Sequence, residues 1–173
     1  SPPPMTTGFQ DADPAAWQEA LELTLLSPVQ FINAVVDGMA DRGWGRIVNI
    51  GTGAAKYPAE VRVLSGPPRA ALVNYTVAVA KKVAKQGVMI NNILPGMFHT
   101  EGIRGPFEER AKANGTSYDE EVESFIKNWR IPAGRFGDPE DLGAFVALFC
   151  SAQANYLCGQ SLVIDGGIGN STF

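Results

Sequence analysis

The sequence predicts an α/β fold built on a parallel sheet, because short runs rich in Val and Ile alternate with longer runs of helical periodicity. Residues 46–50 and 88–94 are two such short runs, and they are typical of strands buried on both faces. Apolar residues at helical spacing fill the segment 64–85 between them. A strand, a helix and a second strand in this order form a βαβ unit, whose two strands are parallel.

The chain before the first of these strands should hold one long helix. Residues 1–12 contain Pro, Thr and Gly without periodicity, which predicts an extended segment. Asp13 can accept hydrogen bonds from the free amides of a first helical turn, and Pro14 is well tolerated at the next position. Apolar residues then recur at helical spacing to about residue 39, with Pro28 as the candidate kink.

The second half of the chain predicts an excursion followed by a helix and a last strand. Gly and charged residues in 97–116 predict a mobile loop with one short helix over about 107–113, and the capping box at 117–120 begins a helix that ends near residue 129. Asp138-Pro139 repeats the helix-start signal, and residues 161–165 form the last strand. We expect one domain over residues 1–173, with 97–130 as its substrate-loop and helical excursion.

Composition excludes several classes of function. The net charge is −4 and the fourteen basic residues do not cluster, so we expect no nucleic-acid partner. No uninterrupted apolar run approaches the about eighteen residues of a membrane span, and no leader pattern opens the sequence, which favours a cytoplasmic location without membrane contact. Cys150 and Cys158 are too few for a zinc site or a disulfide framework, so we expect reduced thiols and no metal.

Two signatures near the end of the chain resemble one enzyme family. Residues 131–141 (IPAGRFGDPED) and 159–167 (GQSLVIDGG) are similar to the C-terminal signature of short-chain dehydrogenase/reductases (SDRs) of the 3-oxoacyl-carrier-protein reductase type. The strand ends at 49–52 (NIGT) and Pro95-Gly96 fit the same family.

The resemblance implies a fold and a missing part. It covers about residues 14–167 and implies the C-terminal part of a doubly wound, Rossmann-like parallel sheet with flanking helices, in which 46–50, 88–94 and 161–165 are the family's fifth to seventh strands. Roughly the first third of the family's length is then absent. That part would carry the Gly-rich turn that binds a dinucleotide pyrophosphate, and Gly51-Thr-Gly53 does not replace it, because no helix is expected to open there.

The missing part sets the expected cofactor and partners. The resemblance implies NAD or NADP only if the N-terminal half is supplied, and otherwise no cofactor. Without its neighbour, the strand 46–50 would be an edge with unpaired backbone groups. We therefore expect the first half to exist as a separate chain, a cleaved fragment or a preceding segment, so that the partner is an N-terminal SDR segment or a second SDR chain. The family's four-helix interface also implies a homo- or hetero-oligomer through helices 14–39 and 64–85.

Four positions carry the family's chemistry, and all four are substituted here. The family uses a Tyr, a Lys four residues later, a Ser and an Asn. Counting back from Pro95 puts the Tyr position at Ser65, which puts the Lys position at Arg69 and the Ser position at Thr52; alignment of the first helix puts the Asn position at Thr24. No Tyr in the chain is followed by Lys four residues later.

The resemblance also assigns contacts to a nicotinamide cofactor. Pro95 and Gly96 would line its site, and Thr100 would contact it if it is bound. His99 is the only histidine and lies where the family holds the nicotinamide amide, so it is either a lining residue or a surface histidine.

Each substituted position also has a structural interpretation. Ser65 is placed to cap the following helix, Arg69 to be a solvated charge in its first turn, and Thr52 to bond the backbone at a strand end. As a chemical group, the Ser65 hydroxyl is far less acidic than a phenol, whose pKa is about 10. Arg69 can bind an anion but cannot shuttle protons.

Three functions are compatible with these residues. The first is an SDR-fold polypeptide related to NAD(P)-dependent carbonyl reductases but catalytically degenerate or partial, acting with its missing N-terminal half or a partner; it explains all four substitutions together. The second is an atypical SDR oxidoreductase in which Thr52 polarises a carbonyl and water or substrate supplies the proton. The third is a non-redox enzyme that binds an anionic substrate at Ser65 and Arg69.

Overall fold

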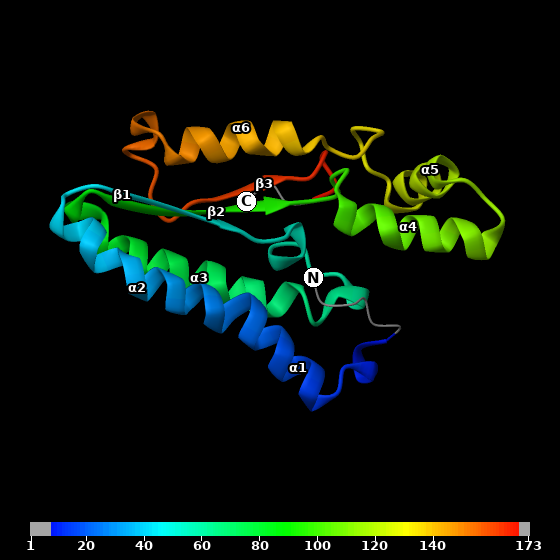
Figure 1. Cartoon of the computed structure of the whole chain (residues 1–173), viewed down its shortest axis with the longest axis horizontal. Coiled ribbons are helices and arrows are strands. Elements are labelled where there is room, and N and C mark those ends of the chain that lie inside the picture. Colours follow the sequence, from blue (N-terminus) through cyan, green and yellow to red (C-terminus); the bar gives the residue numbers. More distant parts are fainter. Residues whose placement is uncertain (1–7, 170–173) are drawn as a thin grey trace.

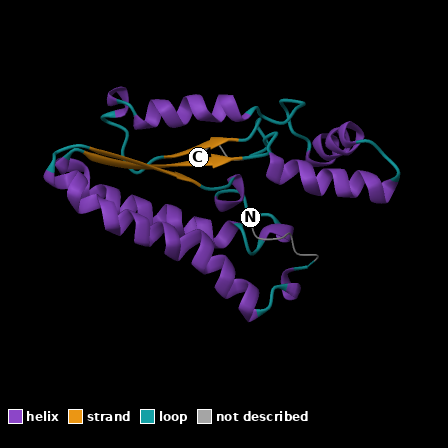
Figure 2. Cartoon of the chain, in the orientation of Figure 1, coloured by secondary structure: helices purple, strands orange, loops and turns teal. Residues whose placement is uncertain are grey.

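Three parallel strands form the sheet in the computed structural model, which describes residues 8–169. Strand β1 (Gly45–Ile50) pairs with β2 (Val88–Pro95), and β2 pairs with β3 (Ser161–Ile164), in the order β1-β2-β3. Figure 2 shows the strands as a narrow central layer between helices. The predicted α/β class, the parallel sheet and its three strands are confirmed.

Helices cover both faces of this sheet (Figure 1). Helices α2 (Ser27–Asp41) and α3 (Gly66–Val83) lie on one face, and α6 (Pro139–Cys150) lies on the other. Six apolar residues of α2, α3 and β2 form the core on the first face: Ile32, Val36, Ala80, Val83, Val88 and Ile90. Burying such side chains contributes about 1.5–3 kcal/mol each, so this layer holds the helices to the sheet.

Helix α1 (Pro14–Leu21) begins where the sequence predicts, because the Asp13 carboxylate accepts a 2.8 Å hydrogen bond from the Ala16 amide. Residues 1–7 of the predicted extended segment lie outside the described residues, and Phe9–Asp11 form a short 3₁₀ turn. A π turn at Glu22–Leu26 joins α1 to α2 and ends two residues before Pro28, the predicted kink. Pro28 has no amide to donate four residues back, and the wider turn accommodates that loss.

The continuous helix Pro14–Asp41 is the one described helix that is long and apolar enough to cross a membrane by length and composition alone. Its uninterrupted apolar runs are short, as the sequence predicts, but the polar residues between them do not lower the mean hydropathy of the helix below that of a membrane span. Length and composition alone are weak evidence for a membrane span, since core helices of soluble proteins have the same properties. Much of the helix is uncovered within the described chain, and Phe31 is 71% exposed.

Helices α4 (Glu101–Asn114) and α5 (Tyr118–Trp129) lie beyond the carboxyl end of the sheet (Figure 1). They enclose a second apolar cluster formed by Phe107, Val122, Phe125, Ile131 and Phe136. The prediction of a short helix over 107–113 is wrong in extent, because the helix begins directly after Thr100. Pro106 lies inside this helix and has no amide to donate to the Gly102 carbonyl four residues earlier. Gly102 is exposed, so water can replace that donor, and burial of Phe107 outweighs the loss.

The capping box at the start of α5 is confirmed. The Ser117 hydroxyl accepts a 3.2 Å hydrogen bond from the Glu120 amide, and the Ser117 amide donates at 2.7 Å to the Glu120 carboxylate. Both groups satisfy backbone donors that no helical carbonyl can reach, which explains why this start is readable from the sequence.

Buried polar side chains tie the strands together inside the sheet. Asn49 of β1 donates to the Thr76 hydroxyl at 2.8 Å, and Thr76 donates to the Leu72 carbonyl at 2.8 Å. Asn92 of β2 donates to the Ser161 hydroxyl of β3 at 3.1 Å. These bonds join β1 to α3 and β2 to β3, so the groups are satisfied although they are largely withdrawn from water.

A buried arginine closes the amino end of the sheet. The Arg46 guanidinium donates to three backbone carbonyls and to the Asn155 side chain, at 2.8–3.2 Å. Its guanidinium carbon also lies 5.1 Å from the centre of the Trp44 ring. This arginine joins the start of β1 to the loops that precede β2 and β3.

Candidate active site

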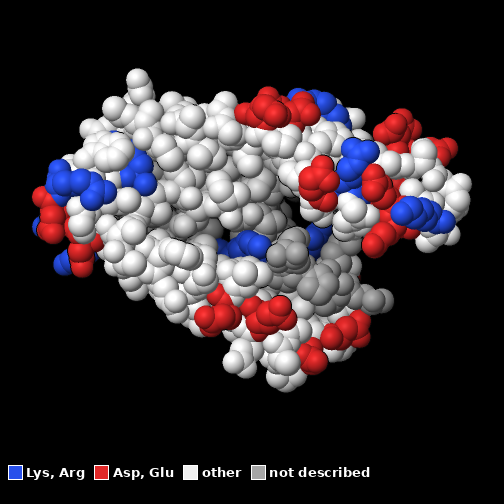
Figure 3. Space-filling view, in the orientation of Figure 1, with Lys and Arg blue, Asp and Glu red and all other residues white. Residues whose placement is uncertain are grey.

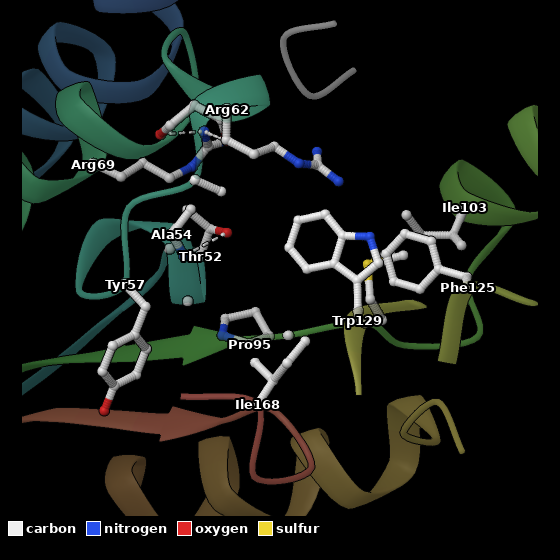
Figure 4. Close-up of a pocket in the computed structure, with 16 residues that line it drawn as sticks. Thr52, Ala54, Tyr57, Arg62, Arg69, Pro95, Ile103, Phe125, Trp129 and Ile168 are labelled. Atoms are coloured by element: carbon white, nitrogen blue, oxygen red, sulfur yellow. Dashed lines mark hydrogen bonds between the residues drawn. The ribbon is translucent and has the colours of Figure 1, made fainter. Parts of the chain in front are cut away.

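A cavity of about 230 Å³ lies at the carboxyl ends of β1 and β2 (Figure 4). This is the edge at which open α/β sheets bind their ligands. The lining comes from the turn after β1, the segment before α3, the end of β2, the excursion helices and the segment after β3. Of the sequence-predicted site residues, the cavity brings together Thr52, Ser65, Arg69, Pro95 and Gly96.

Thr52 holds the turn after β1. Its hydroxyl oxygen accepts from the Ala54 amide at 3.4 Å, as the structural interpretation predicts, and its own hydrogen is left to donate. A three-residue 3₁₀ turn, Gly53–Ala55, opens here, so the expectation that no helix starts at this glycine pair is right only for an α-helix. Thr52 therefore presents a fixed hydroxyl at the cavity wall.

Ser65 and Arg69 form a hydrogen-bonded pair. The Arg69 guanidinium donates to the Ser65 hydroxyl at 3.0 Å and to the Ser65 carbonyl at 3.2 Å. The prediction that Ser65 caps α3 is wrong: Gly66 is followed by Pro67 and Pro68, which have no amide for a capping hydroxyl to bond. The prediction of a solvated Arg69 is also wrong, because the side chain turns back to Ser65 and is half-buried.

Arg62 is a second basic group in the cavity, and sequence reasoning missed it. It ends the 3₁₀ turn Glu60–Arg62, and Figure 4 shows its side chain reaching toward Trp129. Burial lowers the pKa of Arg62, while burial and then the charge of Arg62 lower the pKa of Arg69. Both stay protonated near neutral pH. Neither has a carboxylate within ion-pair distance among the described residues.

The opposite wall is apolar. Phe125 and Trp129 of α5 stack with ring centres 5.3 Å apart and an angle of 10° between their planes. Ile103 of α4 and Ile168 after β3 complete the wall. Tyr57 also borders the cavity, but Figure 4 shows its hydroxyl pointing away from Thr52. No local sequence signal marks these residues, because only the tertiary fold brings their elements together.

Pro95 and Gly96 form the floor of the cavity at the end of β2. The Gly96 amide donates to the Ile164 carbonyl of β3 at 2.8 Å. A Cβ at Gly96 would lie 2.7 Å from the Asp165 Cβ, so this close approach requires glycine.

The other predicted positions do not line the cavity. Thr24 is buried inside the π turn, where its hydroxyl donates to the Ala20 carbonyl at 2.6 Å. Thr100 is exposed at the start of α4, and its carbonyl accepts the first amides of that helix. His99 is exposed beside Tyr118 and the Phe136 ring. The described residues contain no group of three or more metal-ligating side chains.

Comparisons with known proteins cover nearly the whole chain. The sequence model of the family described as Enoyl-(Acyl carrier protein) reductase matches residues 1–169. The 3-oxoacyl-(acyl-carrier-protein) reductase FabG of Vibrio cholerae is 28% identical over 88% of this chain and 57% of its own length. The acetoacetyl-CoA reductase of Cupriavidus necator is 29% identical over 92% of this chain and 60% of its own length.

Solved structures have the same fold. The L-sorbose reductase of Gluconobacter frateurii, complexed with NADPH and L-sorbose, superposes with a TM-score of 0.89 at 28% identity, over 96% of this chain and 64% of that chain. This chain therefore spans about three fifths of the length of the relatives that it matches.

Proposed function

The chain belongs to the short-chain dehydrogenase/reductase family, and on that premise we propose that it is the catalytic part of an atypical NAD(P)-dependent oxidoreductase acting on a carbonyl substrate. The observation that carries this proposal is the Arg69–Ser65 hydrogen bond, which lies in the same cavity as the Thr52 hydroxyl. A cavity with two fixed hydroxyls and a cation at the carboxyl edge of the sheet suits an oxygen that gains negative charge during reduction.

The residues of the chain have distinct roles in this chemistry. Thr52 and Ser65 donate hydrogen bonds to the carbonyl oxygen. Arg69 occupies an acceptor position of the Ser65 hydroxyl, so that the hydrogen of that hydroxyl faces the substrate, and its charge stabilises the developing alkoxide. When bound, a reduced nicotinamide supplies the hydride to the carbonyl carbon. Neither hydroxyl titrates near neutral pH, so water supplies the proton.

The described residues fit the nicotinamide end of such a cofactor. Pro95 and Gly96 would hold it at the cavity floor, and the Arg69 fork can bind the hydroxyls of a ribose. The sequence contains no G-x-G-x-x-G turn for the pyrophosphate. The structure of the related L-sorbose reductase contains NADPH, which supports a nicotinamide cofactor here.

We assign the adenosine end to an N-terminal SDR segment or a second SDR chain at the outer edge of β1. Within the described residues, β1 pairs on one side only. A groove along this edge is lined by Phe31 and Val35 of α2 and by Ile50, which is 50% exposed. Unpaired backbone groups beside an apolar groove suit a further parallel strand.

The test is a titration of NADPH fluorescence, followed by NADPH oxidation with small ketones, for the chain and for the complex isolated with it from its source cells. We expect Thr52→Val to lower kcat about 100- to 1,000-fold, as the loss of an oxyanion donor does. The pair Ser65→Tyr with Arg69→Lys should raise kcat and introduce a pH dependence that the wild type lacks. NADPH binding by neither preparation would rule out the proposal.

A second candidate is a catalytically degenerate SDR subunit that supports an active partner. The lack of any Tyr-x-x-x-Lys pair favours it, as does the exposed apolar face of α1 and α2, where Leu23 is 48% exposed. This candidate predicts oligomerisation through that face and no hydride transfer by the chain itself. Substituting Leu23 and Phe31 with Gln would then dissociate the complex and remove the partner's activity, while Thr52→Val would leave that activity unchanged.

A further inference from the structure

The cavity is lined on one side by two cations that have no anionic partner among residues 8–169, the part of the chain that the structure describes. Arg62 and Arg69 are the only charged residues among those that line it. Figure 3 shows basic side chains recessed in the hollow near the middle of the view, where no acidic side chain is visible, whereas both kinds lie on its outer parts.

The two arginines are placed differently. The guanidinium of Arg69 is engaged by the Ser65 hydroxyl and carbonyl. Arg62 makes no side-chain hydrogen bond to another described residue, and Figure 4 shows its guanidinium above the Trp129 indole. A planar guanidinium with free donors matches a carboxylate, which it binds through two parallel hydrogen bonds.

The rest of the wall defines the body of the ligand. Phe125, Trp129 and Ile168 offer an apolar surface opposite the arginines. A cavity of about 230 Å³ accommodates a small organic molecule with an aromatic or branched aliphatic group. Binding of an anion would also relieve the repulsion between the two guanidinium groups, which is otherwise screened only by solvent.

We propose that this cavity binds a small organic acid, with the carboxylate held by Arg62 beside Arg69 and the apolar body against Trp129 and Phe125. The substrate class of the proposed oxidoreductase is then a carbonyl acid, and this second step rests on the proposed function. Thr52 and Ser65 receive the carbonyl oxygen, while Arg62 selects for the acid over its neutral derivatives.

The test separates binding from catalysis by using benzoylformate and its methyl ester with the full chain in calorimetry, without cofactor. We expect the acid to bind about 10- to 100-fold more tightly than the ester, the factor that one charge-assisted hydrogen-bonded pair supplies. Arg62→Gln should remove this preference, and Arg62→Lys should retain part of it because the charge is kept. Arg104→Gln, an exposed arginine paired with Glu108 and absent from the cavity lining, should leave it unchanged.

The outcomes are distinct for each proposal. Equal affinity for acid and ester, an acid preference that survives Arg62→Gln in a folded variant, or displacement of benzoylformate by inorganic phosphate at lower concentration would each overturn the carboxylate site. If acid binding depends on Arg62 but no complex reduces benzoylformate or any ketone with NADPH, the site stands and the oxidoreductase function fails. If ketones are reduced with no preference for the acid, the oxidoreductase function stands and the carboxylate site fails.

Discussion

Arginines withdrawn from solvent lie at both ends of the sheet, buried at the amino end and half-buried at the carboxyl end, and their surroundings differ. At the amino end, Arg46 donates to three carbonyls and one amide oxygen and lies over the Trp44 ring. At the carboxyl end, the Arg69 side chain hydrogen-bonds only to Ser65 among the described residues, and Arg62 faces a cavity. A guanidinium whose donors are hydrogen-bonded inside the protein is part of the scaffold. One that is half-buried with free donors is placed for a ligand.

The largest effect should come from removing the satisfied arginine. Arg46→Met would remove all four hydrogen bonds of the guanidinium, and of their acceptors the Gly87 carbonyl still accepts from the Gly45 amide. We expect a loss of about 2–4 kcal/mol in the free energy of unfolding. Urea unfolding followed by circular dichroism measures this loss. Arg42→Met is the matched control, because Arg42 is exposed and bonds only the Gly38 carbonyl. A loss at Arg46 no larger than at Arg42 would show that the two ends do not differ in this way.

The hydrogen bonds around Thr76, between the two ends of the sheet, should also stabilise the fold, but by less than those of Arg46. Thr76→Val keeps the shape of the side chain but removes the acceptor of Asn49 and the donor to Leu72. We expect about 1–2 kcal/mol of destabilisation in urea, since the half-buried Asn49 amide loses the shorter of its two hydrogen bonds. Thr76→Ser keeps the hydroxyl and should recover most of that loss. Equal unfolding midpoints for the Val variant and the wild type would argue that the network is dispensable.

Much of the fold is predictable because its signals are local. Asp13 and the pair Ser117 and Glu120 satisfy backbone donors within one helical turn, so residue type and spacing suffice to place the starts of α1 and α5. The three strands are predictable because each is a short apolar run ended by Gly or Pro. The extent of α4 is not, because burial of Phe107 against α5 outweighs its internal proline.

The candidate site is predictable only in part. Of the four positions that the family's spacing marks, Thr52, Ser65 and Arg69 line one cavity and Thr24 does not, while their roles stay a prediction. The predicted capping role of Ser65 is wrong for a reason visible in the sequence: Pro67 and Pro68 leave the start of α3 without the amides that a capping hydroxyl bonds. The sequence could not predict that Arg62 and Trp129 line the same cavity. They are 67 positions apart (129 minus 62) and come together only when the excursion folds over the sheet.

A buried acid in the excursion extends the comparison to negative charge. Glu121 accepts from Asn114, Thr116 and Arg110 at 2.7–2.9 Å, and hydrogen bonds from Asn114 and Thr116 lower its pKa more than Arg110 does. The ionised carboxylate therefore stabilises the fold at pH values above the ordinary pKa of glutamate. That contribution is lost as the pH falls through the lowered pKa of the folded state. Glu121→Gln should therefore be less stable than the wild type at neutral pH, with a difference that shrinks under acid conditions. Thermal unfolding at several pH values measures this, and a constant difference would contradict it.

The smallest change in stability should occur at the cavity. Arg62→Met removes a half-buried charge that bonds no described residue, so we expect the free energy of unfolding to change by no more than about 0.5 kcal/mol, or to rise slightly. The same urea experiment that tests Arg46 measures it. Destabilisation comparable to Arg46→Met would mean that Arg62 belongs to the scaffold, and the contrast between the two ends would fail.

Strand β3 has a further consequence for how a ligand enters. It contributes only four residues to the sheet, all of them half-buried, and it pairs with a strand that lies far back in the sequence: Asn92 and Ser161 are 69 residues apart, against 43 for Asn49 and Asn92. Such a strand should open locally before the rest of the sheet, and hydrogen exchange should be faster for its amides than for those of β2. Because Ile168 follows β3 and lines the cavity, each opening of this strand would loosen one wall and give a ligand a route that leaves β1 and β2 intact.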